Sequence, residues 1–402
     1  MKQLWETVYC RTFQAVLKMG NYFLGYRMPE YLEGAGKVRE LGKFLKEKQI
    51  QDILVVTGSG MMRRGTVQPM LDGFDQAGIR YAVQCFDHPD PTSDDVEAGF
   101  KAYQEQGCKA IVALGGGSRI DCAKAIAAKV VHPGKTVSQL QGLMKVHHPI
   151  PTLVAIPTTA GAGSETTVAA VITDSATHRK AAINDPCLIP KYAVLDPELT
   201  VSLPPFTTAI TGMDALCHAV EAYTNHTYNT RLENNLAKQA VKLIYDNLLT
   251  AFTDGANLEA RQNMQRAAFW AGRAFTRGCV GYVHAVGHTL GGLYGVPHGL
   301  AMAVLLPKVM GQYGKAAEKR LGELADVCDI PGETQGEKAE GFIRWIEQTN
   351  AQMGLPDSFD VIREEDIDRM IVWARKEANP LYPVPVVWGP EDFRRLLQSV
   401  RK

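Results

Sequence analysis

The side chains best suited to metal chemistry are concentrated in residues 281–299. Three of the chain's ten histidines, His284, His288 and His298, lie within fifteen residues of this glycine-rich and otherwise apolar stretch. His284 and His288 are four residues apart, a spacing that places both imidazoles on one face of a helix. Imidazoles in an apolar setting need polar partners, and a metal ion is a strong one.

A second set of polar residues lies upstream, where Asp214 and His218 repeat the spacing of four with a carboxylate and an imidazole. One such pair alone is usually a surface hydrogen bond, but a second cluster in the same chain favours a shared metal site. Asp214, His218, His284 and His298 offer one oxygen and three nitrogens, a ligand set that suits ferrous iron or zinc. Cys217 points away from Asp214 and His218 on a helix, so we expect a small buried residue there.

Length and composition indicate an ordinary globular protein with two domains, because 402 residues exceed what one core usually covers. Lys plus Arg equals Asp plus Glu at 43 each, which gives no electrostatic case for nucleic acid or an anionic membrane. The eight cysteines contain no Cys-x-x-Cys pair, a pattern that predicts reduced thiols and a cytoplasmic location. We expect neither a membrane-spanning helix nor a signal peptide, since no apolar run approaches eighteen residues.

The first half of the chain alternates short apolar runs with helical patterns. Continuous apolar runs of this kind are typical of buried parallel strands. They predict an α/β domain built on a doubly wound, Rossmann-like parallel sheet. Segments 167–173 and 180–183 flank a polar turn and predict a hairpin inserted between the sheet strands. The predicted sheet strands are residues 52–57, 81–85, 110–114, 152–156 and 192–196.

The pattern changes at Leu203-Pro204-Pro205, where two adjacent prolines disfavour both helix and central strand. Beyond them the chain has a helical pattern, which predicts an all-α domain that holds the metal ligands. The expected helices include residues 232–252, 258–275, 315–328 and 337–353. The predicted organisation is therefore an N-terminal helical extension at 1–20, a dinucleotide-binding α/β domain at 21–203 and an all-helical metal and substrate domain at 204–402.

Apolar residues at helical spacing also mark the N-terminus. They predict an amphipathic helix that docks on the body of the protein or on a second subunit. A homodimer or a higher homo-oligomer is the expected assembly. The residues concerned are Leu4, Trp5, Val8, Tyr9, Phe13, Val16 and Leu17.

Two glycine-rich loops follow predicted strands, at residues 115–124 and 157–165. In the first, three glycines let the backbone approach a phosphate at a helix N-terminus. This loop does not match Gly-x-Gly-x-x-Gly, the usual dinucleotide-binding motif. A single glycine-rich turn between a strand and a helix is as often only a tight turn as a phosphate site. The hydroxyls of the second loop suit phosphate, ribose or the nicotinamide amide. Because ligands collect at the carboxyl edge of a parallel sheet, we expect a nucleotide to lie across both loops.

These motifs together resemble the iron-containing alcohol dehydrogenase family, the metal-dependent group III enzymes. The resemblance covers roughly residues 21 to 400 and keeps the family's motif order. It rests on Gly-Gly-Gly-Ser-x-x-Asp at 115–121, Pro-Thr-Thr-Ala-Gly-x-Gly-Ser-Glu at 157–165, Gly-Met-Asp-Ala-Leu-x-His-Ala-x-Glu at 212–221, Gly-x-x-His-Ala at 281–285 and Pro-His-Gly at 297–299.

The resemblance implies a role for each matching residue. Asp214, His218, His284 and His298 would bind a divalent metal, while His288 would lie near the substrate and relay the hydroxyl proton, a structural histidine being the alternative. Lys180 would approach the ribose of the cofactor, with a solvated hairpin charge as the alternative. The other implied contacts to the dinucleotide are Gly116, Gly117, Ser118, Asp121, Thr158, Thr159 and Ser164.

The implied reaction is hydride transfer between a short primary alcohol and a nicotinamide. The metal would lower the pKa of the alcohol oxygen and polarise the carbonyl in the reverse direction. Because the nicotinamide would be held on the other domain, the active site is expected in the interdomain cleft. Fe²⁺ is the expected metal, and Zn²⁺ is the alternative.

The chain departs from the family pattern after the first strand, where many members carry an aspartate that binds the adenosine ribose. Gly58, Ser59 and Gly60 stand there instead, followed by Arg63 and Arg64. A small uncharged loop with two arginines can accept a 2′-phosphate, so we expect contacts from this loop and NADP(H) as the cofactor, with NAD(H) as the alternative. Exposed helix charges are the alternative for the two arginines.

Other functions fit parts of the same pattern. A polyol dehydrogenase or a hydroxyacid–oxoacid transhydrogenase of the same superfamily would share every motif. A nucleotide-binding metal hydrolase or lyase would use the same ligands to activate water. A protein that retains the fold without activity is disfavoured, because it would have no need of buried imidazoles beside an aspartate.

Overall fold

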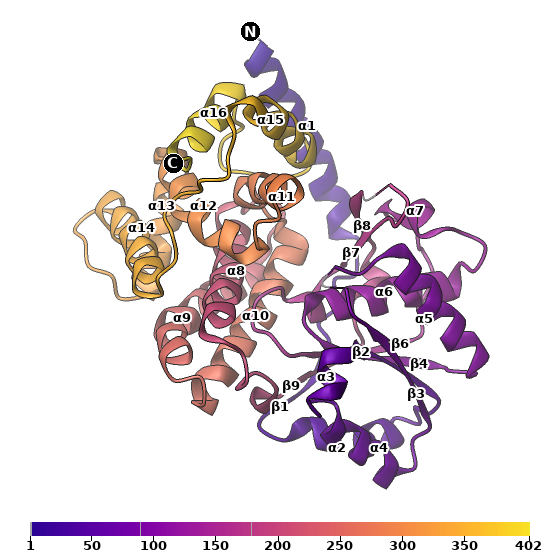
Figure 1. The fold of residues 1–402 in the computed structure, drawn as a ribbon. Helices are drawn as coiled ribbons and strands as arrows, with labels where there is room; N and C mark the ends of the chain where they lie inside the picture. The colour runs from indigo at the N-terminus through magenta and orange to yellow at the C-terminus, as the bar shows by residue number, and fades with distance from the viewer. Residues whose placement is uncertain (1, 89, 178) are drawn as a thin grey trace. The chain divides into compact units, whose positions relative to one another are not determined.

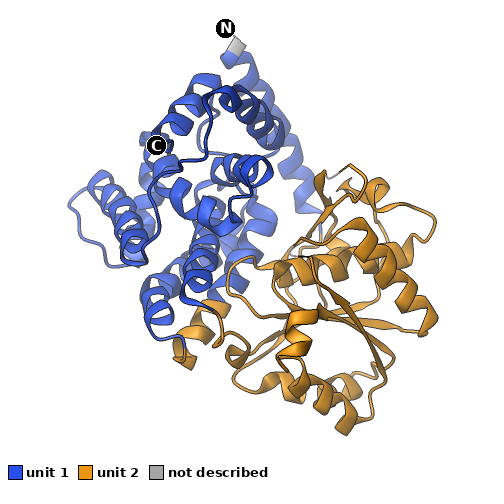
Figure 2. Ribbon diagram, in the orientation of Figure 1, with its two compact units in different colours: residues 1–24, 204–255, 266–402 blue, residues 25–203, 256–265 orange. Residues whose placement is uncertain are grey.

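A computed structural model describes residues 2–88, 90–177 and 179–402 of the chain. The chain divides into two compact units (Figure 2). Unit 1 comprises residues 1–24, 204–255 and 266–402, and unit 2 comprises residues 25–203 and 256–265. No helix of the described residues is long and apolar enough to cross a membrane.

Unit 2 is built on a parallel sheet, which confirms the predicted fold class. Within the described residues this sheet has six strands in the order β1-β9-β6-β4-β2-β3. The central strands are continuous apolar runs such as Ile53-Leu-Val-Val, buried along their whole length. The elements are β1 (Glu30–Glu33), α2 (Lys37–Glu47), β2 (Ile53–Gly58), α3 (Ser59–Arg63), α4 (Gln68–Ala77), β3 (Tyr81–Phe86), α5 (Ser93–Glu105), β4 (Ala110–Gly115), α6 (Gly117–Val131), α7 (Val137–Leu140), β5 (Gly142–Leu143), β6 (Thr152–Pro157), η1 (Ser164–Thr166), β7 (Ala169–Thr173), β8 (Lys180–Asn184), η2 (Pro186–Leu188), β9 (Tyr192–Leu195) and η3 (Pro197–Leu199).

Helices cover both faces of the sheet (Figure 1), and alternate strand residues therefore enter two different cores. Leu54 and Val56 pack with side chains of α5 and α6 on one face. Ile53 and Val55 pack with side chains of α2 and α4 on the other face. Because both faces of the sheet are buried, polar and apolar residues do not alternate along these strands.

The predicted hairpin is present as β7 and β8, which pair antiparallel with Thr173 opposite Lys180. With the short strand β5 they form a separate three-stranded sheet rather than part of the main one. Two strands were not predicted from the sequence. These are β5, which has only two residues, and β1, whose sequence Glu-Tyr-Leu-Glu has no apolar run.

The strand order reverses between β2 and β4. From β2 the chain crosses to the outer strand β3 and then returns to β4 on the opposite side of β2. The loops after β2 and β4 therefore diverge, and a crevice at such a reversal is where open α/β sheets bind ligands. β2 ends at Gly58 and β4 ends at Gly115, so both glycine-bearing loops begin at this edge.

Unit 1 is helical, as predicted for the C-terminal half. The helix α8 begins with Pro205 at its first turn, a position that tolerates the missing N–H group. A capping box between Thr230 and Glu233 begins α9. The elements of unit 1 are α1 (Lys2–Tyr22), α8 (Pro205–Thr224), α9 (Arg231–Thr253), α10 (Leu258–Gly278, whose first residues belong to unit 2), α11 (Tyr282–Tyr294), α12 (His298–Tyr313), α13 (Lys315–Val327), α14 (Gln335–Gln352), η4 (Glu364–Asp366), α15 (Ile367–Ala378) and α16 (Pro390–Ser399).

The N-terminal helix α1 docks on the rest of unit 1 with its polar side, so of the two partners predicted for its apolar stripe the body of the protein is not the one it contacts. Cys10, Gln14 and Asn21 are buried on the docked side, whereas Trp5 and Val16 are exposed. Hydrogen bonds to backbone carbonyls, and not apolar packing, therefore fix this helix to the body. The apolar stripe does not make the intramolecular contact.

Candidate active site

Three helices of unit 1 bring the sequence-predicted metal ligands together. Asp214 and His218 lie one turn apart on α8, His284 lies in the first turn of α11, and His298 is the first residue of α12. A glycine makes the close approach of α12 to α8 possible. A Cβ atom on Gly299 would lie 2.2 Å from the backbone oxygen of Ile210, which leaves room only for hydrogen.

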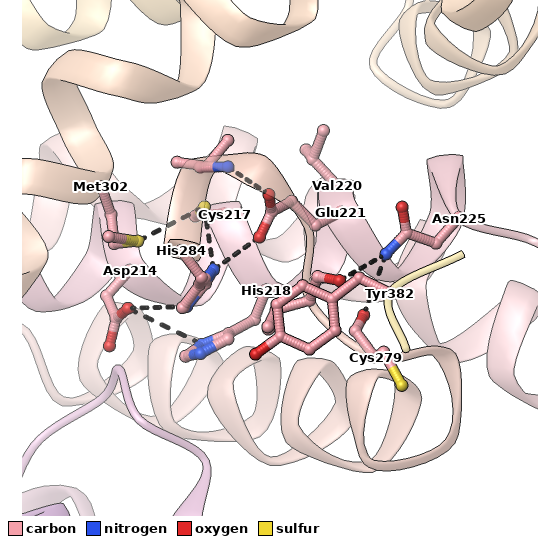
Figure 3. Close-up of polar contacts among 12 residues, drawn as sticks. Asp214, Cys217, His218, Val220, Glu221, Asn225, Cys279, His284, Met302 and Tyr382 are labelled. Atoms are coloured by element: carbon pink, nitrogen blue, oxygen red, sulfur yellow. Dashed lines mark hydrogen bonds and ion pairs between the residues drawn. The ribbon is translucent and has the colours of Figure 1, made fainter. Parts of the chain in front are cut away.

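Asp214 stands at the centre of these ligands. Its Oδ1 atom lies 3.3 Å from His298 Nε2, 3.8 Å from His218 Nδ1 and 4.0 Å from His284 Nε2. Ligand atoms of Asp214, His284 and His298 all lie within 4.8 Å of one another. His218 is outside this mutual set, but its ring stacks on the ring of His284 with centroids 4.6 Å apart (Figure 3).

Three of the atoms that face this centre lack a hydrogen-bond partner. Asp214 Oδ1, His218 Nδ1 and His284 Nε2 are buried and make no hydrogen bond to any residue that the structure describes. Buried polar atoms are rarely left unpaired in proteins, so three around one point indicate a missing ligand. The donor set fits a divalent transition metal, for which a carboxylate and neutral imidazoles are suitable ligands.

The protonation states also suit a cation. Burial opposes ionisation of Asp214, but the surrounding imidazoles hold the pKa of its carboxyl below the usual range. Burial lowers the pKa of His218 to about 3 and that of His284 well below its ordinary value. The site therefore holds a carboxylate beside neutral imidazoles, and these are the forms that bind metal.

Glu221, for which the sequence analysis gave no role, orients His284. Its Oε2 atom lies 2.5 Å from His284 Nδ1, and its Oε1 atom accepts the backbone N–H of Val283 at 2.8 Å (Figure 3). An N–H on Nδ1 that donates to Glu221 leaves the lone pair on Nε2 facing Asp214. Glu221 follows Asp214 and His218 by seven and three residues, so helical spacing is a signal that could have identified it.

Asn225 holds the loop that leads into α11. Its side-chain amide donates to the backbone oxygens of Cys279 at 3.3 Å and Val280 at 2.9 Å (Figure 3). Cys279 has a φ of 61°, a left-handed conformation that costs energy for a residue with a Cβ atom. The amide of Asn225 thus fixes the strained turn that precedes His284.

Cys217 is buried, as expected, and it also touches His284. Its Sγ atom lies 3.7 Å from His284 Nδ1 and 3.8 Å from Met302 Sδ (Figure 3). Burial raises the pKa of this thiol well above its ordinary value, so it remains protonated. Cys217 thus lies on the Nδ1 side of His284, whereas Asp214 lies on the Nε2 side.

His288 lies beside the ligands and has an acidic partner. Its ring stacks on His298 with centroids 5.3 Å apart, and its Nδ1 atom is 2.7 Å from Glu377 Oε1. The hydroxyl of Tyr382 donates to the same carboxylate oxygen at 3.1 Å. The His288 side chain is 45% exposed, so this imidazole can exchange protons with solvent. Glu377 is 89 residues away in sequence, and no local pattern points to it.

In unit 2 the two predicted nucleotide loops pack against each other. A Cβ atom on Gly116 would lie 3.6 Å from Thr159 Oγ1, and one on Gly117 would lie 2.8 Å from the Cβ atom of Ala162. Asp121 joins the loops, because its carboxylate accepts the Ser164 hydroxyl. Asp121 and Ser164 are predicted contacts of the dinucleotide, and in the structure they form a hydrogen bond with each other.

The other predicted cofactor residues have different surroundings. Gly116 and Ser118 lie at the start of α6, where free backbone N–H groups accumulate. Thr158 is buried at the end of β6, and its backbone N–H donates to Gly115 O at 3.0 Å. Ser59 and Gly60 begin α3, directly after Gly58. Lys180 pairs with Asp90 at 2.8 Å on an exposed surface.

Arg119, which the sequence analysis did not single out, lies at the strand reversal. Its side chain covers Gly115 and reaches Gly58, whose added Cβ atom would lie 3.3 Å from Arg119 Nε. Among the described residues Arg119 has no hydrogen-bonding or ion-pair partner, and its Nη1 atom is buried. A guanidinium in this state is suited to an anion. By comparison, Arg63 and Arg64 are exposed.

An α/β unit with paired glycine loops and a helical unit with clustered metal ligands define a nucleotide-dependent metalloenzyme. Two models of one protein family match nearly the whole chain. The model described as "Iron-containing alcohol dehydrogenase" matches residues 29–197, and the model for the C-terminal part of the same family matches residues 208–399. The chain belongs to the iron-containing alcohol dehydrogenase family, whose members are oxidoreductases that act on CH–OH groups with a metal and a nicotinamide cofactor.

Similar proteins span most of the chain. It is 36% identical over 354 residues to the NAD-dependent methanol dehydrogenase of Bacillus methanolicus, covering 87% of this chain and 92% of that protein. It is 36% identical over 368 residues to the 1,3-propanediol dehydrogenase of Klebsiella pneumoniae, covering 89% and 95%. Among solved structures, an alcohol dehydrogenase from Oenococcus oeni matches with a TM-score of 0.88 and 32% identity, covering 94% of this chain and 100% of that one.

Proposed function

We propose that this chain is a cytoplasmic, Fe²⁺-dependent and NADP(H)-preferring dehydrogenase of short primary alcohols that also reduces the matching aldehydes. The observation that carries the proposal is the convergence of three buried, unpartnered ligand atoms, on Asp214, His218 and His284, with His298 adjacent. These four residues would hold the metal. Their donor set suits iron and zinc alike, and membership of an iron-containing family favours Fe²⁺.

When bound, the metal supplies a Lewis acid that lowers the pKa of the alcohol oxygen and polarises the carbonyl of the aldehyde. The protein's own residues do the rest. Glu221 keeps the proton of His284 on Nδ1, so that Nε2 stays available as a ligand. His288 would pass the hydroxyl proton between substrate and solvent, with Glu377 stabilising its charged form.

The nicotinamide cofactor would bind at the carboxyl edge of the sheet in unit 2. Gly116, Gly117 and Ser118 would approach the pyrophosphate with backbone N–H groups. Gly58 and Arg119 support NADP(H), because β2 ends in Gly58 where many family members carry an aspartate, and the Arg119 guanidinium beside it has no hydrogen-bond partner among the described residues. The other proposed contacts are Ser59, Gly60, Asp121, Thr158, Thr159, Ser164 and Lys180.

A short alcohol substrate is supported by the relatives, which act on methanol and 1,3-propanediol. The cytoplasmic location is supported by the thiols, since all eight cysteines are free in the structure. The substrate and the location are proposed for this chain, whereas chemistry with a metal and a nicotinamide cofactor is common to the family.

The proposal is tested by metal removal and replacement. We expect a chelator to abolish 1,3-propanediol-dependent formation of NADPH, and anaerobic Fe²⁺ to restore more activity than Zn²⁺. Asp214→Asn should bind neither metal, whereas Asp246→Asn on the surface of α9 should behave as the unmodified chain. Full turnover without metal, or hydrolysis without formation of reduced nicotinamide, would contradict the proposal.

A further inference from the structure

The helix α1 lies beside α15 in unit 1 (Figure 1), and its polar side makes the contacts that hold it there. Arg11 donates to the backbone oxygens of Val384 at 2.9 Å and Pro385 at 3.0 Å. Gln14 donates to the backbone oxygens of Pro380 and Tyr382. Glu6 forms an ion pair with Arg375 of α15 at 2.5 Å. These directed contacts fix the rotation of the helix about its axis.

The opposite side of α1 and the residue that follows it form an exposed apolar face. Exposed fractions reach 71% at Trp5 and 86% at Phe23. Nine large side chains on this face present roughly 1,000 Å² of apolar surface, about what one partner contributes to a standard protein interface and more than the usual largest patch on a monomer. The apolar face consists of Leu4, Trp5, Val8, Tyr9, Phe13, Val16, Met19, Tyr22 and Phe23.

Spacing along this face suits another helix as its partner. Trp5, Tyr9, Val16, Met19 and Phe23 follow one another at intervals of 4, 7, 3 and 4 residues, which is a repeat of 3.5 with Thr12 in the gap. Such a repeat lets two helices pack side by side along a seam. A two-fold axis would place the seam of α1 against the identical seam of a second copy. The net charge of the chain is zero, so two copies do not repel each other through their overall charge.

The helix lies outside the residues that the family models match. The first of these models begins at residue 29, after the end of α1 at Tyr22.

We propose that the apolar face of α1 packs against the same face of a second copy of this chain. Aromatic side chains dominate it, as they do the centres of protein interfaces. A membrane surface is the less suitable occupant, because helices that lie on lipid carry rows of lysine and arginine beside the apolar face. Here Arg11 is bound to carbonyl oxygens, and Lys18 is the charge that remains on the exposed side among residues 3–22 of α1.

Sedimentation of the full chain over a range of concentrations tests this pairing. We expect the unmodified chain to sediment at an even multiple of the single-chain mass. Tyr9→Glu with Val16→Glu should raise the dissociation constant at least 100-fold, without changing the circular dichroism of the folded chain. Leu143→Glu is the matched control, because Leu143 is similarly exposed in unit 2 and should leave the assembly intact.

A charge-pair experiment then identifies the contact surface. Chains with Tyr9→Lys and Val16→Lys should also be monomeric, and mixing them with the glutamate variant should restore dimers. Positions 9 and 16 are symmetric about the middle of α1, so opposite charges meet in a parallel or an antiparallel pair. A monomeric unmodified chain, unchanged assembly of the glutamate variant, or a mixture that stays monomeric would each overturn the proposal. So would α1-dependent flotation of monomers with vesicles of phosphatidylcholine and phosphatidylglycerol.

Discussion

His284 and Glu221 lie 2.5 Å apart through Nδ1 and Oε2, and this contact determines which nitrogen of the imidazole faces Asp214. Burial raises the pKa of Glu221 to about 7, although the carboxyl also accepts the N–H of Val283. Burial therefore disfavours the charged form of Glu221, and in this position the carboxylate holds His284 in one tautomer.

Glu221→Gln should weaken metal binding by about 10- to 100-fold, because an amide no longer selects the N–H on His284 Nδ1. The measurement is a competition titration with a metal chelator on folded protein. Glu347→Gln provides the control, since Glu347 forms an exposed pair with Lys308. Unchanged metal affinity in Glu221→Gln would show that the tautomer of His284 is fixed by other contacts.

His288→Ala should retain metal but lower kcat by roughly 100-fold or more, which is the usual contribution of a positioned proton-transfer group. Glu377→Gln should lower kcat less, because it removes the partner of the imidazole and leaves the imidazole in place. Metal content and steady-state rates are measured on the same samples. If His288→Ala lost its metal, the relay role would be wrong.

The sequence predicted five of the six described strands of the main sheet and the residues that cluster around Asp214, and the reason is local. Buried strands such as Ile53–Gly58 are continuous apolar runs, and Asp214 with His218 shows the one-turn spacing of a helix. Contacts between segments that lie far apart in the sequence leave no pattern of this kind in the sequence. Glu377 reaches His288 across 89 residues.

Tertiary contacts also decided what the local pattern left open. The apolar stripe of α1 predicted docking on the body or on a second subunit, and in the structure the polar side docks on the body, because carbonyl oxygens near residues 380–385 bind Arg11 and Gln14. Cys217 is small and buried as expected, but no local pattern indicated that His284 approaches it from α11.

Arg119→Gln should raise the KM for NADPH by roughly 10- to 100-fold, the value of a lost charge-assisted contact to phosphate. The KM for NADH should change little, because NADH lacks the 2′-phosphate. Arg63→Gln is the control for a general loss of positive charge, since Arg63 is exposed. Equal losses for the two cofactors would assign Arg119 to the shared part of the nucleotide. Tighter binding of NADH by the unmodified chain would reverse the cofactor preference itself.

Gly299→Ala should destabilise unit 1 and weaken the metal site together. Its Cβ atom would lie 2.2 Å from the backbone oxygen of Ile210, so α12 must move away from α8 and take His298 with it. A cost of about 1–3 kcal/mol or more is expected from such overpacking. Gly311→Ala in the same helix is the matched control, because its Cβ atom would meet nothing within 4 Å and should stabilise slightly. Chemical unfolding at equilibrium distinguishes the two, and equal stabilities would contradict the close approach.

Glu165 should make the stability of the chain depend on pH in a defined direction. Burial raises the pKa of its carboxyl from 4.5 to about 7, against the opposing effects of its own backbone hydrogen bond and of buried Lys124. A raised pKa in the folded state gives stability that is complete below the unfolded value near 4.5 and is lost as the pH rises through 7.

Glu165→Gln removes this titration, so its free energy of unfolding relative to the unmodified chain should increase between pH 5 and pH 8. The expected increase is on the order of 1–3 kcal/mol. Urea unfolding at the two pH values measures it, and Glu340→Gln on the exposed surface of α14 serves as the control. Because only the difference between variants is compared, other groups that titrate in the same range cancel. A difference that is the same at both pH values would mean that Glu165 is ionised in the folded chain at pH 5 already.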